Sequence, residues 1–157
     1  MRAHWSSVSS WNRDTIPGFQ NPAGKFIRHA LAALRDAQMF KTAYAFGLRR
    51  AELRGLDLAD LHFNAKLPQW GQYAALHIRW GKAASGSVPK RRTVFLVPEL
   101  AWWIDGMTQW VEEARGLFEP GNLSAMWPTE RHTRVSLPYI DRRFAALRNE
   151  LASGFHD

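Results

Sequence analysis

Apolar side chains recur with a helical period over the first third of the chain. They fall every three or four positions, at Phe26, Ile27, Ala30, Leu31, Leu34, Ala37, Phe40, Ala43 and Tyr44. This spacing predicts one long amphipathic helix that buries this face, begins at Asn21-Pro22 and ends at Gly47. A shorter helix is predicted over residues 50–54, and residues 1–20, which have no sustained period, are expected to form a poorly ordered tail.

The pattern changes to alternation in the middle of the chain. Leu76, Ile78 and Trp80 alternate with less apolar positions, which predicts a half-buried strand. A second strand is predicted over residues 93–97 and a third within 58–64. The stretch between the first two contains glycine, serine and proline, so residues 81–92 are expected to form a hairpin connection.

Helical spacing returns in the last third of the chain. One helix is predicted from the apolar positions Leu100, Trp103, Ile104, Met107, Val111 and Ala114, and a last one from residue 136 through residue 151. Trp102 and Trp110 fall off the apolar face and are expected to be exposed. The order of elements predicts an α+β fold over residues 21–157 that is mainly helical, with three short strands in its middle; a resemblance described below implies that the strands form a small three-stranded antiparallel sheet.

Composition narrows the classes of protein that fit this pattern. The 157 residues contain no cysteine, which excludes disulfide scaffolds, thiolate metal sites and cysteine nucleophiles. No apolar run approaches the length of a membrane span, and no secretory leader is visible, so we expect a cytoplasmic protein without a membrane partner.

The net charge of +7 is concentrated in one stretch of the chain. Residues 61–98 hold six basic side chains and no acidic one. A concentrated positive field attracts a polyanion, and nucleic acid is the commonest one. A basic surface that binds nothing is the alternative.

Several kinds of chemistry do not fit the sequence. Gly81-Lys82 lacks the upstream glycine and the following hydroxyl residue of a phosphate-binding loop. The six histidines show no metal-ligand spacing, so neither a metal nor another cofactor is expected.

The remaining candidates are cations that suit phosphate. Arg49 and Arg50 follow a predicted helix end, and Glu52 is placed to hold an arginine in one rotamer. Lys82 lies in the predicted hairpin, where a lysine of lowered pKa could protonate a leaving oxygen. The alternatives are a structural ion pair between Arg49 and Glu52 and a solvated Lys82.

Four segments resemble the tyrosine recombinases, or phage integrases, and do so in the family's order. Residues 47–53, Gly-Leu-Arg-Arg-Ala-Glu-Leu, resemble the Gly-Leu-Arg-x-x-Glu-Leu of the first catalytic box, and residues 56–61 resemble the Leu-x-x-x-Asp-Leu that follows it. Residues 78–82 and 92–96 are similar to the hairpin that carries the family's catalytic lysine. The resemblance spans roughly residues 25–155 and implies the N-terminal portion of an integrase-like catalytic domain.

The resemblance also implies roles for individual residues. Arg49 would be the first arginine that clamps the scissile phosphate, and Lys82 would protonate the departing 5′ oxygen. Double-stranded DNA would be the partner, joined by other recombinase protomers, in DNA integration and recombination without a metal. On charge alone, contact with the duplex backbone is assigned to four further cations, Arg50, Lys90, Arg91 and Arg92.

The chain departs from the family near its last residue. His156 is the tentative candidate for the first histidine of the next box, but neither the second arginine nor the nucleophilic tyrosine follows. Tyr44, Tyr73 and Tyr139 do not occupy the nucleophile's place in the order of motifs. We therefore expect an incomplete, inactive fragment that leaves apolar surface uncovered, with marginal stability or self-association; whether the chain is an enzyme is left open.

Two other functions fit the same residues. A non-catalytic DNA-binding regulator would use residues 47–58 as a helix-turn-helix, although such regulators concentrate basic residues on a recognition helix. A non-functional remnant would bind nothing.

Overall fold

The fold is known from a computed structural model that describes residues 22–79 and 90–154. The helices are α1 (Pro22–Phe46), α2 (Arg50–Gly55), α3 (Trp102–Gln109) and α4 (Leu137–Gly154), and the strands are β1 (Leu61–His62), β2 (Ala75–Ile78) and β3 (Arg92–Phe95). Short 3₁₀ helices cover Leu58–Asp60, Pro68–Tyr73, Pro98–Leu100 and Arg115–Phe118. The predicted N-terminal tail lies outside the described residues.

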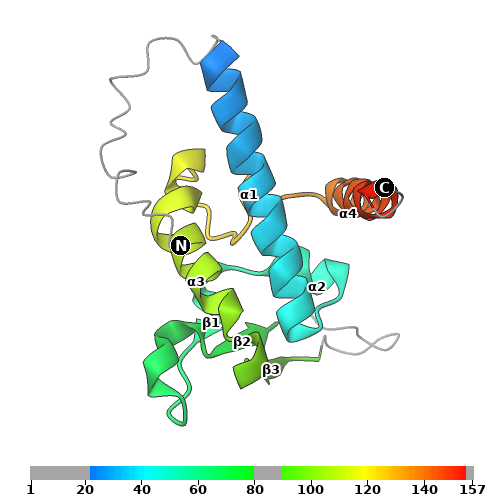
Figure 1. The fold of residues 1–157 in the computed structure, drawn as a ribbon. Coiled ribbons are helices and arrows are strands. Elements are labelled where there is room, and N and C mark those ends of the chain that lie inside the picture. The colour runs from blue at the N-terminus through cyan, green and yellow to red at the C-terminus, as the bar shows by residue number, and fades with distance from the viewer. Residues whose placement is uncertain (1–21, 80–89, 155–157) are drawn as a thin grey trace, which may run out of the picture.

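The three strands form one antiparallel sheet in the order β1-β2-β3. Leu61 pairs with Leu76, which pairs with Val94, so these three side chains share the face that points into the core. Figure 1 shows α1 and α3 side by side above the sheet. The predicted mixed fold of helices and a small three-stranded antiparallel sheet is confirmed, and Gly47 ends α1 in a left-handed conformation as expected.

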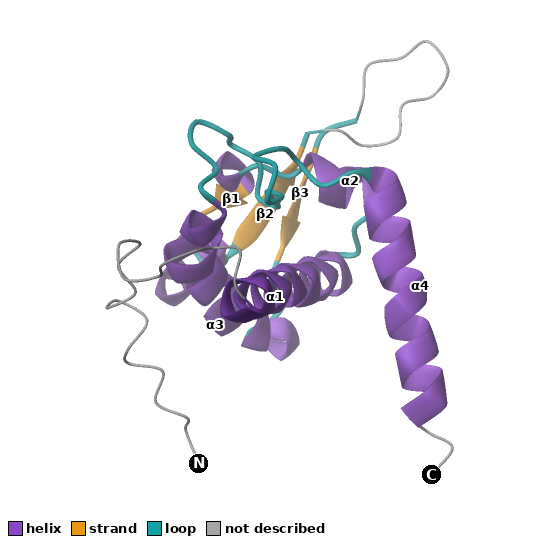
Figure 2. Cartoon of the chain, turned by 90° about the horizontal axis from the view of Figure 1, so that it is seen from above, coloured by secondary structure: helices purple, strands orange, loops and turns teal. Residues whose placement is uncertain are grey.

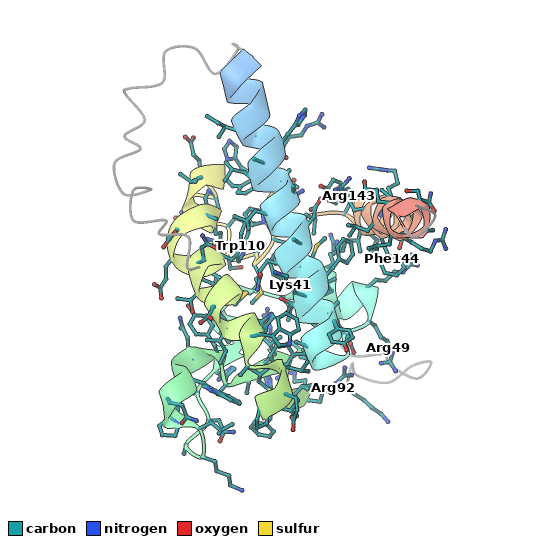
Figure 3. The ribbon with its side chains drawn as sticks, viewed as in Figure 1. Lys41, Arg49, Arg92, Trp110, Arg143 and Phe144 are labelled. Atoms are coloured by element: carbon teal, nitrogen blue, oxygen red, sulfur yellow. The ribbon has the colours of Figure 1, made fainter. Side chains whose placement is uncertain are left out.

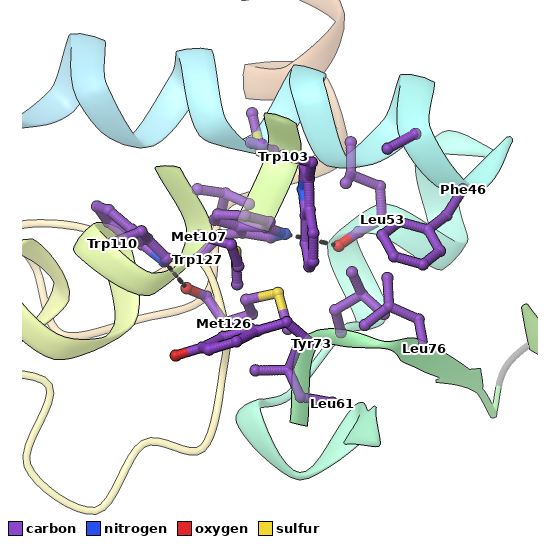
Figure 4. Packing of buried hydrophobic residues seen from close by; sticks show 14 of the residues in the cluster. Phe46, Leu53, Leu61, Tyr73, Leu76, Trp103, Met107, Trp110, Met126 and Trp127 are labelled. Atoms are coloured by element: carbon purple, nitrogen blue, oxygen red, sulfur yellow. Dashed lines mark hydrogen bonds between the residues drawn. The ribbon is translucent and has the colours of Figure 1, made fainter. Parts of the chain in front are cut away.

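The core is rich in tryptophan, and each buried indole N–H has an acceptor (Figure 4). Trp103 donates to the Thr42 hydroxyl at 2.8 Å, and Trp110 donates to the Met126 carbonyl at 3.0 Å. Trp127 donates to the carbonyl of Leu53 at 3.1 Å, which ties α2 to the segment before α4. Because a buried indole N–H without a partner is costly, these bonds fix how the large rings are oriented.

The buried face of α1 differs from the predicted one. Leu34 and Tyr44, both predicted to be buried, are 36% and 74% exposed. Arg35, Asp36 and Thr42 are buried instead. Arg35 and Asp36 find hydrogen-bond partners about a hundred residues away, at the Pro128 carbonyl and the Tyr139 hydroxyl, and Thr42 bonds to Trp103, so their burial leaves no lone polar group.

The helix that begins with α3 also corrects one prediction. Trp102 is 47% exposed as expected, but Trp110 is completely buried. Trp110 comes seven residues after Trp103 and three after Met107, both fully buried, so an ordinary helical period places it on their face and the sequence prediction assigned it to the wrong side. Residues Trp110–Ala114 then form a π-helical turn at the end of α3.

Helix α4 is attached to α1 through a group of polar side chains that we call the Asp36 cluster: Arg35, Asp36, Tyr139 and Arg143. Asp36 accepts hydrogen bonds from Arg35 at 3.0 Å, Tyr139 at 2.8 Å and Arg143 at 2.7 Å. Figure 2 shows α4 running away from the sheet and from the rest of the molecule. None of the helices in the described part of the chain has the length and apolar character needed to cross a membrane.

The far part of α4 leaves two large apolar side chains, Phe144 and Leu151, exposed. Phe144 nevertheless contacts Phe40 of α1, with ring centroids 5.9 Å apart.

Candidate functional site

The site begins where the chain turns from α1 into α2. After Gly47, Arg49 is extended and precedes the first residue of α2. Its backbone N–H donates to Glu52 Oε2 at 2.9 Å, and its carbonyl accepts from the backbone N–H of Leu53 at 2.8 Å. Glu52 thus satisfies a free N–H at the start of α2, which is the local reason the helix begins here.

Glu52 also binds two arginines, and we call Arg49, Glu52 and Arg92 the Glu52 cluster. Both carboxylate oxygens accept from Arg92, at 2.8 Å and 3.0 Å. The Arg49 guanidinium is farther away, with Nη1 3.4 Å from Oε1. The Glu52 side chain is 1% exposed, whereas Arg49 is 61% and Arg92 39% exposed. Figure 3 shows the two arginines close together below the last turn of α1.

The predicted ion pair between Arg49 and Glu52 is therefore present, but the sequence missed the closer partner. Arg92 was expected to contact the DNA backbone, and its guanidinium instead forms a bidentate pair with a buried carboxylate. Ile78 pairs with Arg92 in the sheet, so the connection between β2 and β3 begins beside this cluster.

The other predicted site residues are dispersed or lie outside the described residues. Arg50 forms an ion pair with Asp141 of α4 at the surface. Lys90 and Arg91 are exposed near the start of β3. Lys82 and His156 belong to segments that the structure does not describe, so their roles stay predictions.

A second group of charges, the Asp57 cluster, consists of Asp57, Asp60, Arg79 and Arg134. Arg79 pairs with both aspartates, its Nη2 lying 2.9 Å from Asp60 Oδ2. Arg134 pairs with Asp57 and also donates to the Leu56 carbonyl at 2.7 Å. Burial acts to raise the pKa of Asp57, but the hydrogen bonds from Arg134 and Arg79 outweigh it, and the pKa is lowered. Arg134 carried no signal in the sequence.

The Glu52 and Asp57 clusters neutralise part of the positive charge of residues 61–98. Two of its six cations, Arg79 and Arg92, are paired with carboxylates that lie before it in the sequence. Lys66, Lys90 and Arg91 form no ion pair within the described part of the chain. The local positive field is therefore weaker than the sequence alone predicts.

The three tyrosines differ from an activated nucleophile in different ways. Tyr73 is buried in the core, although its hydroxyl donates to Glu112 Oε1 at 3.5 Å. Burial, together with its hydrogen bond to Asp36, raises the pKa of Tyr139 to about 12, which keeps its hydroxyl protonated near neutral pH. Tyr44 is exposed, and no carboxylate or imidazole bonded to it could act as a base among the described residues.

The geometry at the Glu52 cluster suits an anion. An exposed guanidinium with planar donors is attached to a well-ordered helix start, and a second guanidinium lies beside it. In the described part of the chain, no three histidine or carboxylate side chains gather as metal ligands would.

Comparison with known proteins adds no assignment, because no family model matches the chain and no curated protein matches it either.

Proposed function

We propose that this chain binds double-stranded DNA through its backbone phosphates, as the DNA-contacting part of an integrase-like tyrosine recombinase domain. Arg49 would be the residue that holds the phosphate. The observation that carries the proposal is the exposed Arg49 guanidinium, placed at the start of α2 by the buried Glu52. Arginine donors in a fixed fork match the oxygens of a phosphate group.

Two further features support the proposal. The β2–β3 connection, in which the sequence places Lys82, begins next to this arginine, and exposed Lys90 and Arg91 lie on its return side. Such cations would contact the duplex independently of its sequence. The proposal stops at binding without strand cleavage, since Tyr73 is buried and the raised pKa of Tyr139 keeps its hydroxyl protonated.

The helix-turn-helix alternative is less well supported. The helix that would read the DNA is α2, which has six residues. Two of them, Glu52 and Leu53, are buried, and Arg50 is paired with Asp141 of α4. Few side chains of this helix are thus available to enter a groove.

The proposal is tested by following DNA binding as a function of salt concentration. Replacing Arg49 with alanine should weaken binding of a mixed-sequence duplex and lower the slope of log K against log salt by about 0.9, the loss of one phosphate contact. The matched control is Arg148→Ala, which removes an exposed arginine from the far part of α4. Fluorescence anisotropy titrations supply both quantities. A slope that Arg49→Ala leaves unchanged contradicts the proposal.

A further inference from the structure

Arg92 and Arg49 compete for a single buried carboxylate. The two oxygens of Glu52 are the acceptors for Arg92 at 2.8 Å and 3.0 Å, while the Arg49 guanidinium is within 3.4 Å of only one of them. Arg92 is therefore the main counter-ion of Glu52, and Arg49 is the more exposed and less tightly held of the two arginines.

We propose that Arg92 is a positioning residue: it satisfies the Glu52 carboxylate and thereby leaves the Arg49 guanidinium available to a phosphate. This inference rests on the proposed function of Arg49. Its physical basis is that a carboxylate with 1% exposure cannot be hydrated and must have a cationic partner. As long as Arg92 supplies that partner, Arg49 can exchange its weak contact with Glu52 for a phosphate oxygen.

The loss of Arg92 should therefore act through Arg49. With Arg92 replaced by alanine, Arg49 is the cation left beside Glu52 among residues 22–79 and 90–154, and its backbone is already bonded to that carboxylate. The Arg49 guanidinium should then turn inward and pair fully with Glu52. Arg92 would thus determine DNA binding without contacting DNA.

The ion pair between Arg92 and Glu52 also joins the end of the β2–β3 connection to the start of α2. Arg92 is the first residue of β3, and its pairing with Glu52 joins that strand to α2. Any shift of β3 relative to α2 would change how strongly Glu52 attracts Arg49. The position of the hairpin base therefore sets how readily the phosphate site can be filled.

The test is the salt slope of duplex binding in a set of full-length variants. Arg92→Ala should lower the slope by about 0.9, and the double variant Arg49→Ala/Arg92→Ala should show no further loss, since both changes remove the same phosphate contact. The decisive variant is Arg92→Gln/Glu52→Gln, in which an amide pair replaces the ion pair and the sum of the two charges stays at zero. Its slope should be larger than that of Arg92→Gln alone, because no carboxylate remains to draw the Arg49 guanidinium inward.

The outcomes separate the two claims. If Arg92→Gln/Glu52→Gln has the same reduced slope as Arg92→Gln alone while Arg49→Ala also lowers the slope, Arg92 contacts phosphate directly and the positioning role is wrong. If Arg49→Ala leaves the slope unchanged, the phosphate-binding function itself fails, and the inference that rests on it fails too. Arg92→Ala could fail the test simply by unfolding the chain, and thermal melts of all variants reveal whether it does. Arg92→Gln/Glu52→Gln retains a hydrogen bond between β3 and α2, so it still tests the proposal if Arg92→Ala does not fold.

Discussion

Tyr139 joins two helices, and the contacts that do so also set the pKa of its hydroxyl. Its hydroxyl donates to Asp36 at 2.8 Å, and its ring lies 4.9 Å from the Arg35 guanidinium carbon. Burial and the bond to Asp36 favour the protonated phenol, which is why its pKa rises to about 12. The residue is therefore a structural tyrosine.

The pKa of Tyr139 predicts a loss of stability in alkaline solution. Because the folded pKa is raised above the unfolded value of about 10, the stabilisation is complete below about pH 10 and is lost as the pH rises toward about 12. Tyr139→Phe should be less stable than the unmodified protein at neutral pH, by about 1 kcal/mol, and the difference should shrink above about pH 10. Urea unfolding at a series of pH values measures this. Tyr44→Phe, at an exposed position, is the control and should leave the profile unchanged.

At the scale of elements, α4 depends on a few contacts near its first half. The Asp36 cluster and the contact between Phe40 and Phe144 attach it to α1, and Ile140 is its buried apolar anchor. Residues 148–153 are exposed. The helix should therefore be the least stable of the long elements, and its stability should depend on Asp36.

Replacing Asp36 with asparagine tests this dependence. The change leaves the buried Arg35 with only the more distant and more exposed carboxylate of Glu130 among the described residues, so we expect a loss of about 3 kcal/mol, felt first in α4. Amide hydrogen exchange should speed up more over residues 137–154 than in β2. Asp141→Asn removes the exposed pair with Arg50 and should cost less than about 1 kcal/mol. Equal changes in α4 and β2 would contradict the local role of Asp36.

The sequence was enough to predict which helices and strands exist, but it predicted their buried faces only in part. Periodicity located α1, α2, α4 and the strands because most of each pattern is local. It failed for Arg35, Asp36 and Thr42, whose burial depends on partners contributed by residues beyond 100. For the site, Arg49 and Glu52 were found because they are three residues apart, whereas the bond between Glu52 and Arg92 joins positions forty residues apart. No local pattern reports such a contact.

At the scale of the whole molecule, buried or half-buried carboxylates join segments that are distant in sequence. The Asp36 cluster connects α1 to α4, the Glu52 cluster connects α2 to β3, and the Asp57 cluster connects the end of β2 to the segment before α4. Asp36, Glu52 and Asp57 are each bonded by two arginines. The aromatic core is thus surrounded by ion pairs whose strength depends on ionised carboxylates.

This arrangement predicts that the fold weakens in acid. The lowered pKa of Asp57 means that its contribution is present above its ordinary value of about 3.8 and is lost as the pH falls through the lower, folded pKa. The urea concentration at the unfolding midpoint should decrease as the pH drops below about 4. In Asp57→Asn this concentration should decrease less steeply, because the side chain at position 57 no longer titrates. Asp105→Asn, at an exposed position on α3, should follow the unmodified protein. Parallel acid profiles for Asp57→Asn and the unmodified protein would contradict this role.

The π-helical turn at Trp110–Ala114 contains one residue more than an α-helix would need over the same path. A chain lacking one residue here would continue as an ordinary α-helix, so the backbone itself tolerates the deletion. Every later residue of the helix would then rotate by about 100° about the axis. Arg115, which donates to the carbonyls of Leu123 and Ala125, would point elsewhere, and the loop that leads to Trp127 would lose its support. The length of this turn therefore determines whether Arg115 reaches the loop that leads to Trp127.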